Sequence, residues 1–373
     1  MALQIKRSSL LLSSFLFLLL LSSCHVARYV WWNYADADDY RKFPADTIRN
    51  GETSHPFKTA AIPVKFDLPE KYRTANLNSV DDLLASKKSL AFLVIRNDSV
   101  VYEHYYHGTS RSSVLASFSV AKSFVAALIG IAIQEGSIKS IDQPVTDFIP
   151  EMKDPGFKKV TIGNLLTMRS GIKFNEGYKT PFGEMAKFYY GKNLKKYTLK
   201  LKVSGTPGEK YEYQSGNTQI LAMVLERATG KTLPEYLEEK IWKPAGMEFP
   251  ATWNTDSRKH HEVKSFCCIN ARAVDFAKFG QLFLDQGRSD EKSVIPASWI
   301  KATLNLETGS RDSQGYPYTY LWRVTKEKNF FAKGLLGQYI FVCPSKHIVI
   351  VRFGEEAGDL VWPELFRQLS LQL

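Results

Sequence analysis

The sequence has few of the residues that build disulfide frameworks and metal sites. Its 373 residues include 4 cysteines and 7 histidines. Three cysteines lie outside the N-terminal region, at Cys267, Cys268 and Cys343, and adjacent cysteines rarely pair with each other. We therefore expect these three to be unpaired, buried side chains. The histidines have no spacing with supporting carboxylates, so the sequence predicts no metal site and indicates no cofactor.

The chain also lacks the features of several other classes of protein. No Gly-x-Ser-x-Gly motif is present, which argues against a general α/β hydrolase. With 44% hydrophobic and 13% aromatic residues and no low-complexity segment, the composition excludes a disordered or collagen-like chain. The net charge of +11 would permit a nucleic acid or an anionic membrane as partner. The sequence of the N-terminal region distinguishes these two possibilities.

The first 23 residues have the pattern of a signal peptide. Lys6 and Arg7 precede an apolar run over residues 10–21, which is shorter than the ~20 residues that a membrane-spanning helix needs. The following Leu-Ser-Ser-Cys resembles a bacterial lipobox, which implies lipid attachment to Cys24 and removal of residues 1–23. An ordinary secretory signal or an uncleaved anchor is the alternative. We predict export to the bacterial cell envelope, facing the periplasm or the exterior, with the lipid on Cys24 in the membrane and no binding to nucleic acid.

The rest of the chain divides into a tether and a folded body. Residues 24–75 are rich in aromatic residues and prolines, and we expect a tether that packs partly on the body. Strand-like runs occur near the two ends of the body, at 91–106 and 338–353, whereas the periodicity between them is mostly helical. This distribution predicts an α+β fold over residues 76–373 rather than a parallel βαβ series.

One Ser-x-x-Lys motif differs from the others by its context. The spacing occurs four times, but only Ser119 and Lys122 open an intensely apolar helix, at 124–133. Residues three apart share a helix face, so the lysine amine can lie beside the serine hydroxyl, and apolar surroundings disfavour the protonated amine. Such a lysine can activate a serine, and the Ser119 amide in the first turn can bind a developing oxyanion. A helix-capping serine with a lysine that reaches solvent is the alternative interpretation.

A second segment supplies a candidate phenol. Residues 207–217 run from a Pro-Gly turn through an extended piece to the start of a helix, and they place Tyr213 and Ser215 on a loop. A phenol beside a lysine ammonium ionises more readily and can relay a proton to a leaving group. Tyr213 would then complete a Ser-Lys-Tyr unit, although a tyrosine alone in such a place is more often a packing residue.

The order of these motifs resembles the serine β-lactamase and penicillin-recognising family, in particular the class C-like branch with its esterases and 6-aminohexanoate-dimer hydrolases. The resemblance covers about residues 80–373. It includes Leu-Leu-Thr-Met-Arg-Ser-Gly at 165–171, Pro-Ala-Gly-Met at 244–247 and Ala-Val-Asp-Phe-Ala-Lys-Phe-Gly at 273–280. It implies an antiparallel sheet flanked by helices, with an inserted helical subdomain at about 150–265. It also implies that Ser119 is the nucleophile, Lys122 its partner base and Tyr213 the tyrosine of the family's Tyr-x-Asn motif.

Two positions depart from the family pattern. Ser215 stands where most members have asparagine, so a shorter hydroxyl would contact the substrate. The third family motif, usually Lys-Thr-Gly or His-x-Gly, aligns with Ala332-Lys333-Gly334 and puts alanine in the position of the cation. A shifted alignment would put Lys333 there instead, but it would displace Gly334. Gly334 would still let the substrate approach the strand, and the Leu335 amide matches the second oxyanion donor.

Together these features predict an exported serine hydrolase that cleaves a small-molecule amide or ester through an acyl-enzyme, with no obligate protein partner. A true β-lactamase or D-Ala-D-Ala carboxypeptidase is one alternative. A non-catalytic lipoprotein that binds or senses its ligand is another, but binding alone does not require Ser119, Lys122 and Tyr213 together. The lysine-rich stretch 187–202 could rest against an anionic lipid or wall polymer, although such runs more often form a solvated surface.

Overall fold

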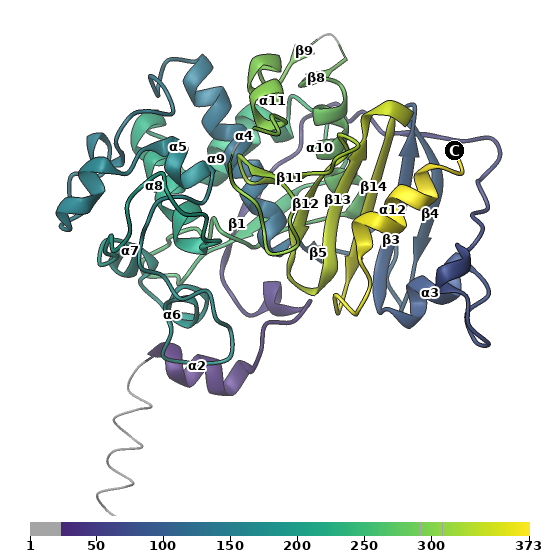
Figure 1. Cartoon of the computed structure of the whole chain (residues 1–373), viewed down its shortest axis with the longest axis horizontal. Coiled ribbons are helices and arrows are strands. Elements are labelled where there is room, and N and C mark those ends of the chain that lie inside the picture. The colour runs from purple at the N-terminus through teal and green to yellow at the C-terminus, as the bar shows by residue number, and fades with distance from the viewer. Residues whose placement is uncertain (1–23, 291, 308) are drawn as a thin grey trace, which may run out of the picture.

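The protein has a mixed α+β structure in which a large antiparallel sheet lies beside a helical part (Figure 1). The computed structural model describes residues 24–290, 292–307 and 309–373. The predicted signal peptide lies outside the described residues. Within the described part of the chain, no helix is both long and apolar enough to cross a membrane. The α+β class predicted from the sequence is confirmed.

The large sheet has eight strands in the order β10-β11-β12-β13-β14-β3-β4-β2. Neighbouring strands are antiparallel, except that β2 pairs with β4 in parallel. The strands predicted near the two ends of the body are β3, β4, β13 and β14, and the pairing of β14 with β3 joins the two hairpins. The strands are Lys58–Thr59 (β2), Ser89–Arg96 (β3), Ser99–Tyr105 (β4), Tyr318–Thr319 (β10), Trp322–Val324 (β11), Phe330–Gly334 (β12), Gln338–Cys343 (β13) and Ile348–Gly354 (β14).

Helices cover both faces of this sheet. On one face, α3 (Val80–Ser86) and α12 (Trp362–Ser370) pack against the strands and share a buried apolar cluster with them. On the other face, α10 (Ala273–Leu284) packs against β13 and β14. α3 begins after Ser79, whose hydroxyl accepts a hydrogen bond from the Asp82 amide in a capping box. Because side chains alternate along each strand, the sheet separates two layers of core.

The helical part is built around α4 (Ala121–Gln134). Residues 121–132 are all buried, which is expected for a helix that is apolar on every side. α8 (Ser215–Thr229) packs against α4 and α5 and ends at Gly230, which has a φ of 69°. The remaining helices are α5 (Ile162–Leu166), α6 (Glu184–Tyr190), α7 (Leu194–Thr198), α9 (Leu233–Leu237), which continues as a π-helix over Glu238–Trp242, and α11 (Ala297–Thr303).

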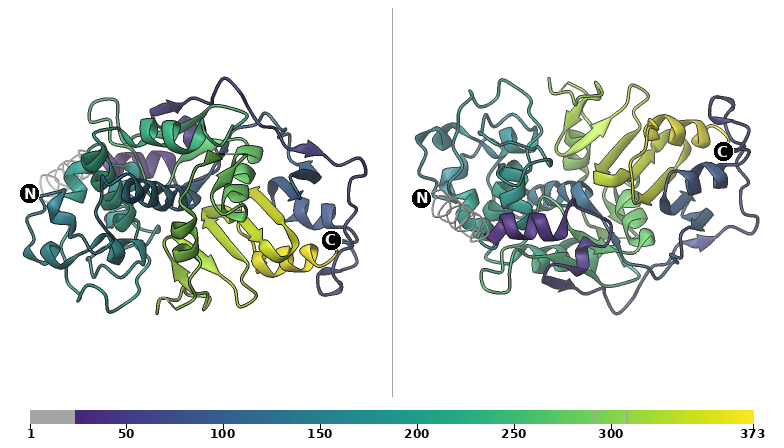
Figure 2. Two further views of the ribbon diagram at one scale, coloured as in Figure 1. Left: turned by 90° about the horizontal axis from the view of Figure 1, so that it is seen from above. Right: turned by 90° about the horizontal axis from the view of Figure 1, so that it is seen from below.

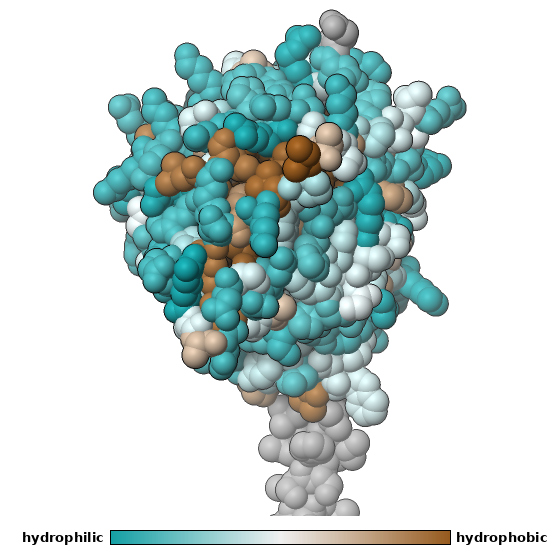
Figure 3. Space-filling model, turned by 90° about the vertical axis from the view of Figure 1, so that its right-hand side faces the viewer, coloured by the Kyte–Doolittle hydropathy of each residue, from teal (hydrophilic) through white to brown (hydrophobic). Residues whose placement is uncertain are grey.

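Residues 24–75 contribute a strand to each of the two larger sheets. The second sheet has the order β1-β6-β7-β5, and this segment supplies β1 (Ala45–Ile48) there and β2 in the large sheet. α2 (Cys24–Trp32) lies against α6, whereas the C-terminus lies at the far end of the molecule beside α3 (Figure 2). The surface at that far end is mostly hydrophilic and is crossed by a band of apolar side chains (Figure 3). The other short strands are Leu115–Ala116 (β5), Ala251–Asn254 (β6), Ile269–Ala271 (β7), Arg288–Ser289 (β8) and Lys292–Ser293 (β9).

Candidate active site

Ser119 lies on a tight turn at the start of α4. The turn is a 3-10 helix, η3 (Phe118–Val120), that runs directly into α4. Phe118 adopts the left-handed backbone conformation, with a φ of 44°, which is costly for a bulky residue and is often found at functional sites. Ser119 is half-buried, whereas Phe118 and Val120 are buried. The strained turn therefore presents the serine hydroxyl from an otherwise buried segment.

Lys122 lies one turn after Ser119 and faces it. The lysine is 1% exposed. Its Nζ donates hydrogen bonds to Ser119 Oγ at 2.9 Å and to the Phe266 carbonyl oxygen at 2.6 Å. The structure therefore brings together the two residues that the Ser-x-x-Lys spacing singled out. An amine fixed at this distance can exchange a proton with the hydroxyl.

Tyr213 reaches the same place from the loop before α8. Its ring centroid lies 5.1 Å from Lys122 Nζ. The ring packs edge-on against Tyr318, with 6.1 Å between the ring centroids. The Met168 carbonyl oxygen accepts a 2.8 Å hydrogen bond from the Glu212 amide, so the turn after Leu-Leu-Thr fixes the loop that carries Tyr213. The three residues of the predicted Ser-Lys-Tyr unit thus lie in one cluster.

Gly334 brings strand β12 close to the turn that carries Ser119. A Cβ atom at this glycine would lie 2.5 Å from the Ser117 carbonyl oxygen, so a larger residue would push the two segments apart. Leu335 follows directly, at the start of the 3-10 turn η7 (Leu335–Gly337). The two backbone segments that were expected to supply oxyanion donors therefore meet at this point.

The position predicted for the family cation holds no charge. Ala332 is completely buried on β12, and the neighbouring Lys333 side chain lies on the opposite face of the strand. Besides Lys122, a guanidinium lies beside Tyr213: the guanidinium carbon of Arg323 is 5.7 Å from the tyrosine ring centroid. Arg323 is itself paired with Asp312 at 2.7 Å, and both side chains are almost fully buried. The sequence carries no signal for this ion pair, because no local spacing connects its two members.

Ser215 anchors the loop that carries Glu176 and Tyr178, for which the sequence gives no signal. It is fully buried at the first residue of α8, and its hydroxyl and amide donate hydrogen bonds to the two carboxylate oxygens of Glu176, at 2.6 and 2.7 Å. The same carboxylate accepts a 3.0 Å hydrogen bond from the Tyr178 hydroxyl. The polar group at the surface here is therefore the carboxylate of Glu176 rather than the expected serine hydroxyl.

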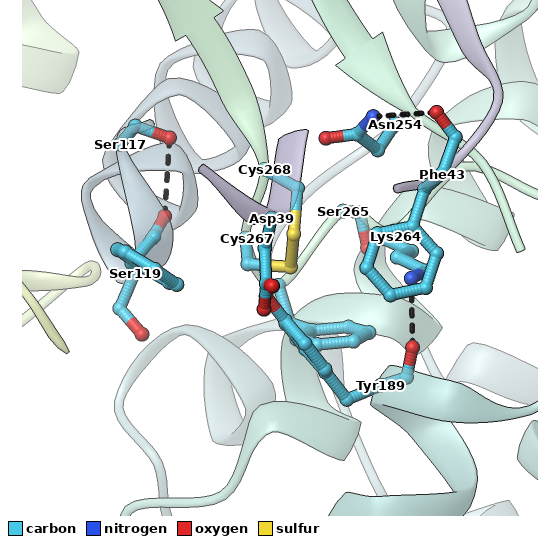
Figure 4. The surroundings of a disulfide bond; sticks show 12 residues. Asp39, Phe43, Ser117, Ser119, Tyr189, Asn254, Lys264, Ser265, Cys267 and Cys268 are labelled. Atoms are coloured by element: carbon cyan, nitrogen blue, oxygen red, sulfur yellow. Dashed lines mark hydrogen bonds between the residues drawn. A yellow bond between two sulfur atoms is a disulfide. The ribbon is translucent and has the colours of Figure 1, made fainter. Parts of the chain in front are cut away.

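The expectation for the adjacent cysteines was wrong. Cys267 and Cys268 form a disulfide and both are buried, whereas Cys343 is free and buried as expected. The backbone at Cys268 is in the left-handed region, with a φ of 77°, and this turns the two neighbouring side chains towards each other. The disulfide directly follows Phe266, whose carbonyl oxygen binds Lys122, and Figure 4 shows Ser119 in its surroundings.

The fold and this cluster together define a class of protein. A serine at the start of a buried helix, a lysine bonded to it and a tyrosine from the helical part, all beside an antiparallel sheet, form the arrangement of serine hydrolases with the penicillin-recognising fold. The sequence profile of the beta-lactamase family matches residues 78–359, and the chain belongs to that family.

Relatives and solved structures agree with this assignment. The chain is 27% identical over 297 residues to the 6-aminohexanoate-dimer hydrolase of Paenarthrobacter ureafaciens, an alignment that covers 74% of this chain and 73% of that protein. It is 25% identical over 210 residues to esterase EstB of Burkholderia gladioli, covering 50% and 53%. A solved structure from Bacillus anthracis, assigned as a 6-aminohexanoate-dimer hydrolase, matches with a TM-score of 0.80 at 25% identity and covers 92% of this chain and 93% of that one. The protein is a serine hydrolase of the amidase or esterase type.

Proposed function

We propose that the protein hydrolyses small, uncharged esters or linear amides through an acyl-enzyme formed on Ser119. The observation that carries this proposal is the 2.9 Å contact between Lys122 Nζ and Ser119 Oγ, with the Tyr213 ring 5.1 Å from the same amine. Relatives named as a 6-aminohexanoate-dimer hydrolase and as an esterase support an amide or ester as substrate. The proposed reaction uses only side chains and backbone amides of this chain.

The first half-reaction forms the acyl-enzyme. Ser119 Oγ attacks the acyl carbonyl carbon while Lys122 takes the hydroxyl proton. The carbonyl oxygen becomes an oxyanion, and the backbone amides of Ser119 and Leu335 stabilise it. Tyr213 then relays a proton from Lys122 to the leaving oxygen or nitrogen as its bond to the acyl carbon breaks. The products are a free alcohol or amine and an ester of Ser119.

Water completes the reaction by the reverse route. The water loses a proton to the Lys122 and Tyr213 pair as its oxygen attacks the ester carbon. The bond between that carbon and Ser119 Oγ then breaks, and the serine recovers its proton from the same pair. The acid is released, and the three side chains return to their starting protonation. Glu176 transfers no proton in this scheme and acts by holding its loop beside the site.

A fluorophosphonate probe tests the proposal, because it reacts with activated serines. We expect rapid labelling of the full chain, a labelled peptide that contains Ser119 and no labelling of Ser119→Ala. Ser298→Ala is the matched control, since Ser298 begins another Ser-x-x-Lys pair, on α11, and this variant should label as the wild type does. A folded wild-type chain that neither labels nor hydrolyses p-nitrophenyl acetate would instead support the non-catalytic binding protein.

We also propose that the protein is a lipoprotein of the bacterial cell envelope that faces the periplasm or the exterior. The support is the Leu-Ser-Ser-Cys sequence after the apolar run of residues 10–21. Since α2 begins at Cys24, a lipid attached there would place the helical part next to the membrane. Mass spectrometry should find a diacylglyceryl group on Cys24, and Cys24→Ala should leave the precursor uncleaved. An unmodified chain that begins at or beyond His25 would identify an ordinary secretory signal.

A further inference from the structure

An apolar cavity of about 190 Å3 lies between the N-terminal segment and the turn that follows β12. Leu335 and Leu336 line it from that turn, and Tyr29, Tyr34 and Ala35 line it from the N-terminal segment. An apolar cavity of roughly 150 Å3 holds a benzene molecule, so this one has room for a phenyl ring or a chain of about six carbons. The cavity thus suits an apolar group of limited size.

The tyrosines contribute ring faces to this cavity. The Tyr29 hydroxyl donates a 3.0 Å hydrogen bond to the Tyr178 carbonyl oxygen, and the Tyr190 hydroxyl donates one of 2.6 Å to the Asn33 carbonyl oxygen. Because these hydroxyls are bonded to the backbone, the rings are left as apolar walls. The wall is completed from α6 by Met185, Ala186 and Tyr189.

The N-terminal segment is held in place by a buried carboxylate. Asp39 is 3% exposed, accepts a 2.7 Å hydrogen bond from the Tyr189 hydroxyl and pairs with Lys42 at 2.6 Å. β1 follows within a few residues and pairs with β6. The N-terminal residues that line the cavity are therefore part of the folded body, although they precede residues 78–359, the segment that matches the family.

The cavity adjoins the acyl side of the proposed reaction. It is lined by Leu335, whose amide would hold the acyl carbonyl oxygen. The leaving group must lie towards Tyr213, which would protonate it. Tyr213, Tyr318 and Arg323 do not line the cavity, whereas Tyr178, on the loop that Glu176 joins to Ser215, does. An acyl chain on the carbonyl carbon can therefore enter the cavity while the leaving group stays outside it.

We propose that residues 29–35 complete a subsite for the acyl chain, and that this subsite selects apolar acyl groups of about six carbons or a phenyl ring. The inference rests on the proposed function, because it assumes an acyl-enzyme on Ser119. Burial of one methylene can raise kcat/KM by up to about fourfold. Because hexanoate can bury several more methylenes than acetate, we expect kcat/KM for p-nitrophenyl esters to rise at least about tenfold from acetate to hexanoate. It should fall again for dodecanoate, which is longer than the cavity.

Two tryptophan substitutions test the subsite in the full chain. Ala35→Trp fills the cavity from the N-terminal segment, and Ala61→Trp is the matched control at an exposed alanine outside it. Ala35→Trp should lower kcat/KM for hexanoate at least about tenfold more than for acetate. Ala61→Trp should leave kcat/KM for both esters unchanged. Tyr34→Ala should enlarge the cavity and shift the optimum to a longer chain. Hydrolysis of acetate, which does not need the cavity, reports that each variant is folded.

A second substrate series varies the alcohol at constant acetyl group. Ala35→Trp should change kcat/KM by the same factor for every alcohol in this series, because the leaving group lies outside the cavity. A loss that follows the alcohol, or an equal loss at every acyl length, would overturn the acyl subsite. A flat acyl-length profile of the wild type would also overturn it, while labelling of Ser119 and hydrolysis of acetate would leave the proposed function intact.

Discussion

The carbonyl oxygen of Phe266 accepts a 2.6 Å hydrogen bond from Lys122, and the same amine lies 2.9 Å from Ser119 Oγ. The lysine is therefore held from two sides, by the turn that presents the serine and by the segment that precedes β7. In its proposed role as base, Lys122 needs no reorientation before it accepts a proton, and such fixed geometry is what efficient proton transfer requires.

Lys122 and Tyr213 are predicted to act as one unit with Ser119. We expect Lys122→Ala and Tyr213→Phe each to lower kcat for p-nitrophenyl acetate by about 10² to 10⁴-fold, because each removes a step of proton transfer. The double variant should lose much less than the product of the two single losses. Burst kinetics with p-nitrophenyl acetate measure acylation separately from turnover. Losses that multiply would show that the two residues act independently.

The disulfide is predicted to support the position of Lys122. It directly follows Phe266, so the Cys267→Ser, Cys268→Ser double variant should loosen the carbonyl that holds the lysine. We expect kcat to fall about threefold to tenfold with little change in KM, since small misplacements of catalytic groups cost this much or more. Cys343→Ser is the control, because this buried cysteine is free. A double variant with the kcat of the wild type would contradict the prediction.

Glu176 is predicted to hold the Tyr178 loop on α8. Its carboxylate accepts hydrogen bonds from the Ser215 amide and hydroxyl and from the Tyr178 hydroxyl. Glu176→Gln removes the charge and one acceptor, and a hydrogen bond to a charged group contributes about 1.5–3 kcal/mol. We expect KM for the hexanoate ester to rise about tenfold, because Tyr178 also lines the acyl cavity. Glu209→Gln, at an exposed glutamate, is the control and should leave KM unchanged.

The parts of the site that the sequence predicted are those whose pattern is local. Ser119 and Lys122 lie within one helix turn, so spacing and an apolar context were enough to select them. The contacts of Glu176 with Ser215 and of Arg323 with Asp312 join residues 39 and 11 positions apart, and no helix or strand spacing records such a pairing. The disulfide was missed for another reason, because a left-handed backbone at a residue other than glycine is uncommon and has no sequence signal.

The strands of the N-terminal segment, residues 24–75, also have no local sequence pattern that predicts them. Prolines and aromatic residues in 24–75 predict a tether that packs partly on the body, because the alternation that marks a strand is absent from such short pieces. β1 nevertheless pairs with β6, and Ala45 lies opposite Asn254 in that register. A strand of four residues depends on its partner for its conformation, so it can be found only when the partner is known.

Asp275, in α10, predicts a specific dependence of stability on pH. Burial raises the pKa of Asp275 to about 7, although the amides of Glu248 and Phe249 donate hydrogen bonds to its Oδ1. The folded protein therefore keeps a proton on Asp275 between about pH 4 and pH 7, where the unfolded chain has lost it. Since the folded state binds more protons in this range, the free energy of unfolding should fall as the pH rises through it.

Asp275→Asn removes this titration and keeps the shape of the side chain. The asparagine Oδ1 can still accept the two amides, and the amide nitrogen replaces Oδ2, a buried oxygen that has no hydrogen-bond partner among the described residues. Urea unfolding at about pH 4.5 and pH 8 measures the effect. The stability of the variant relative to the wild type should increase by on the order of 3 kcal/mol between these values. A constant difference would mean that Asp275 ionises with an ordinary pKa.

Substrates that carry a carboxylate are predicted to be poor. Ala332, which the sequence alignment predicts at the position of the family cation, is completely buried, and Arg323, whose guanidinium lies beside Tyr213, is already paired with Asp312. A hydrogen bond between a cation and a carboxylate contributes roughly 1.5–3 kcal/mol. Its absence should weaken carboxylated substrates about tenfold to a hundredfold relative to uncharged ones.

A chromogenic cephalosporin and its methyl ester form a matched pair for this test, because they differ at the carboxylate alone. We expect kcat/KM for the free acid to be no higher than for the methyl ester, and both values to lie well below that for a p-nitrophenyl ester of a short apolar acid. The physical reason is that buried Ala332 offers the carboxylate no charge in exchange for its hydration, and the Arg323 guanidinium is already paired with Asp312. A higher kcat/KM for the free acid, or a large preference for the cephalosporin over the p-nitrophenyl ester, would contradict the alignment of Ala332 with the cation and would identify a β-lactamase.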